Sequence, residues 1–202
     1  MARWEPGAPQ RLQQAALELF ATRGFEQTTA MEIAQSAGLT ERTFFRHFSD
    51  KREVLFHGQR VLVEAFVAGV ESAPPDASPI DIVASALRSA ASFFPDERRS
   101  HSRARQSVID QNSALQEREQ HKLAGLATAV ADALRARGVD DLAAALAAES
   151  GITVFALAFA QWIREHEQRS LDEIAAEVLG ELVTLTGKAT AHRATSAERT
   201  DG

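Results

Sequence analysis

Hydrophobic residues recur at helical spacing along almost the whole chain. Leu12, Ala15, Ala16, Leu19 and Phe20 follow the i, i+3, i+4, i+7, i+8 pattern and predict a helix over residues 10–23. Similar stripes predict eight further helices, over residues 30–37, 41–47, 51–71, 80–94, 96–111, 114–137, 142–165 and 171–186. The pattern therefore predicts an all-α fold of about nine helices, with a small three-helix head followed by a larger helical domain.

The second and third of these helices are short and are joined through a glycine. Thr29 is a good N-cap for the first, and Gly38 can end it in the left-handed conformation that costs other residues energy. Thr40 caps the second helix, on which Phe44 and Phe48 are four residues apart and face inward together. This arrangement predicts a helix-turn-helix.

Capping and turn-forming residues predict where the helices begin and end. Asp50 is expected to cap the helix over 51–71, with Glu53 as its capping-box partner. The stretch SAPPDASP from Ser72 to Pro79 ends that helix, and Gly187 is expected to close the last one. The expected organisation is a flexible arm (1–9), a helix-turn-helix domain (10–56), an effector-binding and dimerisation domain (57–187) and a disordered tail (188–202).

The outward face of the helix over 41–47 has the chemistry that reads DNA. Arg42 can contact guanine O6 and N7, Glu41 can accept from cytosine N4, and Thr43 can touch a thymine methyl group or a phosphate. Taken singly, Arg42 or Arg46 would be better explained as part of a solvated helix face. The set of residues together favours a DNA-binding surface. The predicted DNA-binding residues are Thr28, Thr29, Thr40, Glu41, Arg42, Thr43, Phe45, Arg46, His47 and Lys51.

These residues resemble the DNA-binding signature of the tetracycline-repressor (TetR) family of bacterial transcriptional regulators. The resemblance covers about the first quarter of the chain and includes Gly24, Phe25, Ile33 and the stretch A-G-L-T-x-R-T-F-F-R-H-F-x-x-K that ends at Lys51. Family members often have tyrosine where this chain has Phe45, so no phosphate hydrogen bond is expected from that side chain. The resemblance implies a homodimer that binds a double-stranded DNA operator and a small-molecule effector.

Composition and charge fit this interpretation without adding a site. The net charge is −6, but residues 1–60 hold eight Lys/Arg against seven Asp/Glu, so the acidic excess lies in the rest of the chain. The absence of cysteine excludes disulfides and thiolate metal sites and is typical of the cytoplasm. The N-terminus has no apolar run of a signal peptide, and the longest apolar run, Ile152–Ala160, is too short to span a bilayer. We therefore expect a cytoplasmic protein with no membrane partner.

The helices over 142–165 and 171–186 carry more apolar surface than one domain needs. This predicts a homodimer through residues of about 142–186, in which each subunit contributes two helices to a four-helix interface. The alternative is that the first of them is a buried central helix of a monomer. In the predicted homodimer, two heads about 34 Å apart could read a palindrome.

A ligand pocket is predicted between the same helices and the preceding ones. An ordinary core is the better explanation for any single member of the set, whereas the family resemblance favours an effector site. The predicted ligand-binding residues are Leu87, Phe93, Phe94, Arg105, Ile109, Leu123, Leu126, Phe155, Phe159 and Trp162.

The C-terminal half resembles the type of regulator associated with acyl-CoA-like effectors, including mycofactocin-system regulators. The resemblance rests on the arginine-rich segment 98–105, on S-A-L-x-E-R-E from Ser113 to Glu119 and on the pattern ending at Trp162. The four arginines of RRSHSRAR could hold phosphates of such a ligand. The favoured alternative is a solvated charge run that pairs with Asp96, Glu97 and Asp110.

Other classes of function have weaker support. The sequence has no metalloprotease histidine pair, nucleophile elbow, P-loop or dinucleotide fingerprint, so we predict no enzyme, no catalytic residues, no metal and no cofactor. A helical adaptor that uses its helix-turn-helix for protein contact is a third class. The prediction is a homodimeric repressor released by a small hydrophobic effector; the alternative is an activator or a ligand-independent regulator of the same fold.

Overall fold

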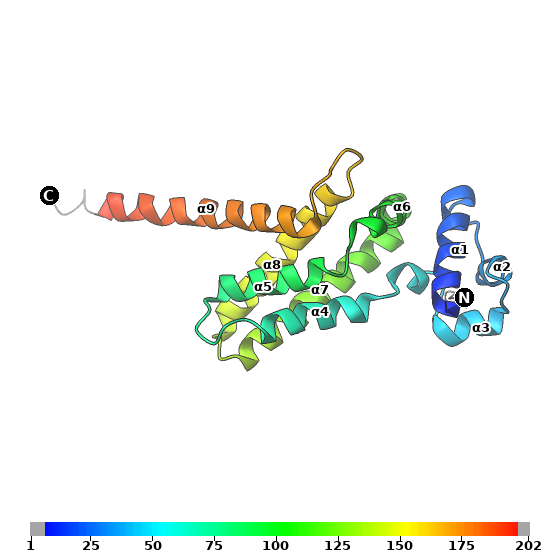
Figure 1. Ribbon diagram of the computed structural model, residues 1–202, viewed down its shortest axis with the longest axis horizontal. Coiled ribbons are helices and arrows are strands. Elements are labelled where there is room, and N and C mark those ends of the chain that lie inside the picture. Colours follow the sequence, from blue (N-terminus) through cyan, green and yellow to red (C-terminus); the bar gives the residue numbers. More distant parts are fainter. Residues whose placement is uncertain (1–6, 198–202) are drawn as a thin grey trace, which may run out of the picture. The chain divides into compact units, whose positions relative to one another are not determined.

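The computed structural model describes residues 7–197, and every regular element within them is helical (Figure 1). The predicted all-α fold is confirmed. The elements, in order, are α1 (Ala8–Arg23), α2 (Ala30–Ser36), α3 (Glu41–His47), the 3-10 helix η1 (Glu53–Phe56), α4 (Gln59–Glu71), α5 (Pro79–Ala91), the 3-10 helix η2 (Asp96–Arg98), α6 (Arg99–Asp110), α7 (Ser113–Ala136), α8 (Asp141–Trp162) and α9 (Leu171–Ala197).

The chain folds into two compact units that do not follow the order of the sequence. The first unit comprises the chain up to Leu62 together with Ser100–Ala124. The second comprises Val63–Arg99 and the chain from Gly125 onward. Helices α4, α6 and α7 each contribute residues to both units. Two segments of the expected second domain (57–187), residues 57–62 and 100–124, thus belong to the first unit.

The first unit has one apolar core, built mainly by the three N-terminal helices. Leu12, Phe20, Ile33 and Phe44 are buried there because the apolar stripes of α1, α2 and α3 converge. The core also contains two residues from the end of α6, Val108 and Ile109, and one from the start of α7, Leu115. The end of α6 and the start of α7 are therefore packed into the head as its own structural parts.

The predicted helix over 51–71 is interrupted. Gly58 has φ 94°, a conformation that ends η1 and lets α4 begin at Gln59. Asp50 does cap the segment, because its Oδ1 accepts from the backbone N–H groups of Arg52 at 2.7 Å and Glu53 at 3.1 Å. The Glu53 carboxylate turns to α7 instead of capping. The expected single helix and the expected capping partner are therefore wrong.

The second unit is built around α8, which packs against α5 and α9. A Cβ on Gly151 would lie 2.8 Å from Val83 Cγ1, so glycine allows α8 to approach α5 closely. Helix α8 is long and apolar enough to cross a membrane by length and composition, with a mean hydropathy of 1.8 over its best window. A core helix has the same properties, and Ala144, Ala148 and Phe155 of α8 are buried in this unit.

The last helix extends beyond the predicted boundary. Helix α9 begins at Leu171 as expected but continues through Gly187 to Ala197, so the expectation that Gly187 ends it is wrong. Of the expected terminal arm and tail, residues 1–6 and 198–202 lie outside the described part of the chain.

Candidate DNA-reading surface and ligand-binding interior

The start of α2 is fixed by a complete capping box. The Thr29 hydroxyl accepts from the Glu32 backbone N–H at 3.2 Å, while the Glu32 carboxylate accepts from the Thr29 backbone N–H at 2.9 Å. The donors on Thr29, and beyond them the guanidinium of Arg23, hold the pKa of the Glu32 carboxyl below its ordinary value. The predicted N-cap at Thr29 is confirmed.

The turn between α2 and α3 is set by backbone hydrogen bonds. Gly38 adopts φ 69°, its N–H donates to Gln35 O at 2.9 Å, and the Leu39 N–H donates to Ala34 O at 2.8 Å. This is the paired bonding of a Schellman motif, which needs a left-handed residue at the position of Gly38. The turn therefore fixes the direction in which α3 leaves α2.

Helix α3 presents two different faces. Its N-cap is Thr40, whose hydroxyl accepts from the Thr43 backbone N–H at 3.2 Å. Phe44 is fully buried and Phe48 nearly so, and their ring centroids lie 5.5 Å apart in the core of the head. Phe45 is 53% exposed. The exposed side chains of this helix are Glu41, Arg42, Phe45, Arg46 and His47.

Besides the capping threonines, two further predicted DNA contacts have partners inside the protein. The Thr28 side chain is buried, and its hydroxyl donates to Gly24 O at 2.9 Å. The Lys51 ammonium donates to the carbonyl oxygens of Phe25, Glu26 and Thr28 at 2.8, 3.4 and 3.2 Å. It also lies 4.3 Å from the centroid of the Phe25 ring. A phosphate contact from Lys51 would require it to leave these carbonyls.

Six aromatic side chains pack together in the second unit. Phe94 is central, with ring centroids 5.8 Å from Phe155, 5.3 Å from Phe159 and 5.9 Å from Trp162. Phe66 meets Phe155 edge-on at 5.3 Å. Phe93 also meets Phe94, with ring centroids 5.1 Å apart, so five of the predicted ligand-binding residues are brought together. Of the others, Arg105, Ile109 and Leu123 belong to the first unit.

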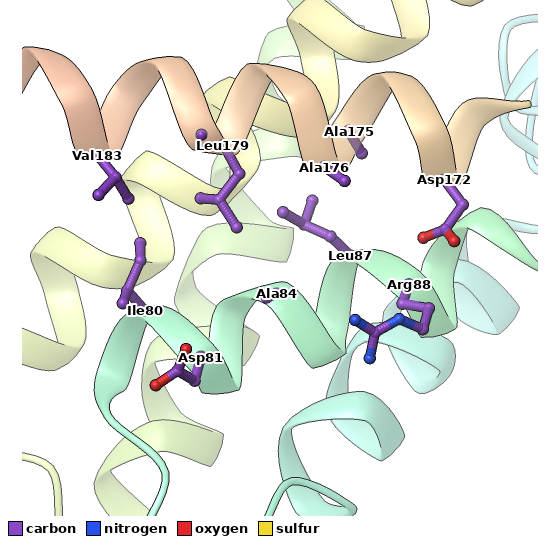
Figure 2. Close-up of a pocket in the computed structure, with 11 residues that line it drawn as sticks. Ile80, Asp81, Ala84, Leu87, Arg88, Asp172, Ala175, Ala176, Leu179 and Val183 are labelled. Carbon is purple, nitrogen blue, oxygen red and sulfur yellow. The ribbon is translucent and has the colours of Figure 1, made fainter. Parts of the chain in front are cut away.

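A cavity of about 430 Å³ lies in the same unit, between α5 and α9 (Figure 2). Leu87 and Ile80 line it from α5, and Leu179 and Val183 line it from α9. The small side chains of α9 leave room between these larger ones. Of the ten predicted ligand-binding residues, Leu87 is the one that lines this cavity. The sequence did not indicate the cavity, because it depends on how two helices distant in the chain approach each other.

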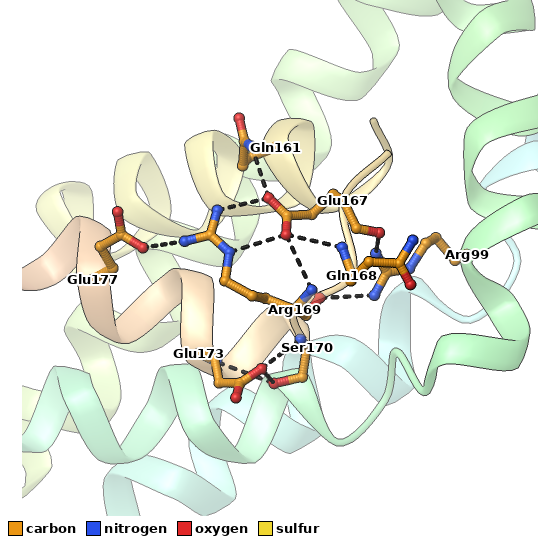
Figure 3. Close-up of polar contacts among 8 residues, drawn as sticks. All are labelled: Arg99, Gln161, Glu167, Gln168, Arg169, Ser170, Glu173 and Glu177. Carbon is orange, nitrogen blue, oxygen red and sulfur yellow. Dashed lines mark hydrogen bonds and ion pairs between the residues drawn. The ribbon is translucent and has the colours of Figure 1, made fainter. Parts of the chain in front are cut away.

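The arginine run is largely engaged with the protein itself. Arg99 pairs with Asp96 at 2.6 Å, and its Cζ lies 5.1 Å from the centroid of the Trp162 ring. It also donates to the carbonyls of Glu167 and Arg169 (Figure 3). Arg98 donates to Phe93 O. In the first unit, Arg105 donates to Leu55 O at 2.7 Å and to Glu119 at 3.1 Å. These bonds correspond more closely to the charge-pairing alternative than to a phosphate site, although the partners are mostly backbone carbonyls.

Comparison with known proteins agrees with the two halves of this architecture. Residues 12–57 match the model of the tetR family of bacterial regulatory proteins, and residues 77–186 match the MftR C-terminal domain. TcmR of Streptomyces glaucescens, an HTH-type transcriptional regulator, is 41% identical over 73 residues, which are 36% of this chain and 32% of TcmR.

A second relative is matched over a shorter segment. MftR of Mycobacterium tuberculosis (strain ATCC 25618 / H37Rv), whose name assigns it provisionally to the regulation of mycofactocin biosynthesis, is 37% identical over 46 residues, 23% of each chain. The matched segments thus span less than a third of either relative.

Solved structures share the fold at low sequence identity. SmeT, the repressor of the Stenotrophomonas maltophilia efflux pump SmeDEF, has a TM-score of 0.57 at 20% identity, covering 89% of this chain and 90% of SmeT. The fatty acid degradation regulator FadR of Bacillus halodurans has a TM-score of 0.55 at 14% identity, covering 89% and 96%. The tetR-family model matches about the first quarter of the chain, and the model of the MftR C-terminal domain matches more than half of the chain. The chain therefore belongs to the tetR family of bacterial transcriptional regulators.

Proposed function

We propose that this regulator is a homodimeric repressor that binds a palindromic operator through α3 and is released by a small hydrophobic effector. The observation that carries the proposal is the division of α3 into two faces. Phe44 and Phe48 anchor the helix in the core, while the side chains of Arg42 and Arg46 are exposed. Such a helix can enter a major groove without disturbing the head. Because operator DNA lies in the cytoplasm, the proposed regulator acts there.

Arg42 is the proposed reader of bases. Its side chain is exposed on the first turn of α3, where a bidentate contact with guanine is geometrically available. Arg46 and His47, in the last turn, are proposed to donate to phosphates on either side of the groove. Phosphate contacts position the helix, and base contacts supply the sequence preference.

Exposed apolar side chains support a homodimer through α8 and α9. Leu142, Leu146 and Leu157 on α8 are 73%, 62% and 57% exposed, and Val183 and Leu185 on α9 are also exposed. Leucines so exposed on two adjacent helices are typical of an interface between subunits. A dimer would also supply the second head that a palindrome requires.

The second unit is the proposed effector-binding part. Its aromatic cluster and the cavity between α5 and α9 supply apolar surface, and the match to the MftR C-terminal domain supports a ligand of related chemistry. A hydrophobic, acyl-CoA-like effector remains the proposed class. FadR of Bacillus halodurans, which has the same fold, is described as a regulator of fatty acid degradation. A ligand-independent regulator or an activator is the alternative.

Release follows from linkage between the two ligands. The effector must bind the DNA-free form more tightly, and operator DNA must weaken effector binding by the same factor. Helix α4, which has residues in both units, is the proposed mechanical link. A thermal-shift screen with acyl-CoA thioesters and fatty acids tests the effector class; absence of any stabilisation would remove it.

The test of DNA reading is a band-shift experiment on the DNA upstream of the protein's own coding region, with a scrambled duplex of equal length as competitor. Wild-type protein should form a sequence-selective, salt-sensitive complex. Arg42→Ala should cost about 1–3 kcal/mol of binding and relax the base preference at one position. Arg88→Ala, which removes an exposed arginine from α5, should bind as wild type does. Full selectivity in the Arg42 variant would contradict the assignment of α3 as the reading helix.

A further inference from the structure

We propose that Phe45 determines part of the DNA sequence preference by holding its ring against the 5-methyl group of a thymine, one base step from the base that Arg42 reads. This inference rests on the proposed DNA-binding function and names the base chemistry that the middle of α3 recognises. Phe45 is 53% exposed on a seven-residue helix whose buried side is made by Phe44.

The half-exposed ring of Phe45 leaves apolar surface in contact with water. Its exposed neighbours on α3, Arg42 and Arg46, end in guanidinium groups, which water solvates well. A phenyl ring has no hydrogen-bond donor or acceptor, so it can satisfy neither a phosphate nor the polar edge of a base. The groups of the major groove that an apolar side chain binds are the methyl groups of thymine. The chemistry of the side chain therefore selects a thymine methyl group as its partner on DNA.

The ring of Phe45 is supported by the core of the head. It stands edge-on against Phe44, with ring centroids 5.4 Å apart and an interplanar angle of 81°. Phe44 is fully buried and packs in turn against Phe48, with ring centroids 5.5 Å apart. Because one side of the Phe45 ring is already packed, little conformational freedom remains to be lost when its exposed side meets a ligand. The head therefore presents this apolar surface in a defined place.

The position of Phe45 on α3 places it beside the proposed base-reading arginine. Residues three and four apart lie on the same face of a helix, so Phe45 follows Arg42 and Glu41 on the face that α3 exposes. Three residues of an α-helix advance about 4.5 Å along its axis, and successive base pairs are about 3.4 Å apart. With Arg42 on a guanine, the ring of Phe45 therefore reaches the neighbouring base pair along the groove.

Thr43 is the rival for a thymine methyl group on the same helix. Its side chain is partly buried, and its hydroxyl lies 2.9 Å from the hydroxyl of Thr40, in the cap of α3. The hydroxyl of Thr43 is thus engaged at the start of the helix, whereas Phe45 has no polar group to satisfy and offers a larger exposed apolar surface. Phe45 is therefore the better candidate for the methyl contact.

Exchange of thymine for deoxyuridine tests the proposal, because the two bases differ only in the 5-methyl group. The full-length protein is titrated by fluorescence anisotropy onto two versions of the upstream duplex, one with thymine and one with deoxyuridine at every thymine position. Wild-type protein should bind the deoxyuridine duplex about fifteenfold more weakly, from a factor of about four for each methyl group buried by the two heads of a dimer. Phe45→Ala should lose this discrimination, because it has no ring to meet the methyl group.

Thr43→Ser supplies the matched control, because it removes the methyl group of Thr43 and keeps the hydroxyl that contacts Thr40. It should retain the wild-type ratio of affinities for the two duplexes. Any effect of deoxyuridine on the shape of the duplex is shared by all variants, so comparison of their ratios isolates the contact between ring and methyl group. Duplexes with deoxyuridine at single positions then locate the thymine, which we expect beside the base whose preference Arg42→Ala relaxes. An unchanged urea midpoint shows that Phe45→Ala is folded.

Loss of the discrimination in Phe45→Ala but not in Thr43→Ser supports the contact. If wild-type protein prefers the upstream duplex to its scrambled control but binds the thymine and deoxyuridine versions equally, the contact is absent while the proposed function stands. If Thr43→Ser loses the discrimination and Phe45→Ala keeps it, Thr43 reads the thymine and the inference is overturned. If wild-type protein shows no preference for the upstream duplex, the proposed function itself fails, and the thymine contact fails with it.

Discussion

The reading surface of α3 and the aromatic interior of the second unit differ in the sequence separation of the contacts that build them. The start of α2 and the turn into α3 are set by bonds between residues three to five apart, such as Thr29 with Glu32 and Leu39 with Ala34. In the interior, Phe66 meets Phe155, and Arg99 donates to the carbonyl of Arg169. The helix-turn-helix can therefore be predicted from a short stretch of sequence, whereas the packing of the interior depends on the whole fold. Substitutions can test this contrast, because each region should respond in its own way.

The largest expected effect separates the two faces of α3. Phe44→Ala removes a fully buried ring and should lower the free energy of unfolding by about 3–5 kcal/mol. Phe45→Ala removes the next ring, which is half exposed, and should change it by no more than about 0.5 kcal/mol. Urea unfolding followed by circular dichroism measures both. Equal losses would show that α3 has no free face.

Lys51→Ala decides between two roles for one side chain. Because its ammonium binds three carbonyls of the α1–α2 connection, its loss should cost about 1–3 kcal/mol of stability. Arg46→Ala, on the exposed face, should leave stability unchanged and weaken DNA binding. Should Lys51→Ala instead keep the wild-type melting temperature and lose affinity for all duplexes, the phosphate role that the sequence suggests would be correct.

A smaller effect is expected at the cap of the reading helix. Thr40→Ala removes the hydroxyl that accepts from the Thr43 N–H and should cost about 1 kcal/mol of stability. Thr40→Ser keeps the acceptor and serves as the control. Because α3 is short, fraying at Thr40 should also weaken DNA binding. A Thr40→Ala protein that unfolds at the wild-type urea concentration would show that the cap is dispensable.

The smallest effect concerns the loop before α9, in the second unit (Figure 3). Donation from the Arg169 side chain, then from Gln161 and the Arg169 N–H, holds the pKa of the Glu167 carboxyl far below its usual range. A carboxyl with a depressed pKa stabilises the fold above its unfolded pKa of about 4.3, and this contribution is lost as the pH falls. Glu167→Gln should therefore flatten the decline in melting temperature below about pH 4.5.

The neighbouring Glu165 provides the matched control for that measurement. Its side chain is exposed two residues before Glu167, in the same loop, so Glu165→Gln should keep the wild-type pH profile. If both variants decline with pH as wild type does, the bonds of Glu167 do not contribute to acid stability.

Sequence reasoning found the helices, the caps of α2 and α3 and the inward phenylalanines, because each depends on near neighbours. It missed the break at Gly58, although a glycine inside a helical stripe was a visible signal. It also placed the end of α9 at Gly187, where no turn forms.

The larger misses are long-range. No periodicity could show that Ile109 and Leu115 join the core of the head, or that Lys51 turns back to Phe25 across 26 residues. The predicted pocket residues were good core residues, and the rings do meet. Their division between two units, and the cavity that lies between α5 and α9, follow from tertiary packing alone.

The Schellman turn at Gly38 has a practical consequence for engineering. Its hydrogen bonds join main-chain atoms only, so the angle between α2 and α3 is independent of the side chains that α3 displays. Exchanging Glu41, Arg42, Phe45 and Arg46 for those of another regulator should redirect the protein to a new sequence without refolding it. The head can therefore serve as an interchangeable cassette for synthetic gene circuits.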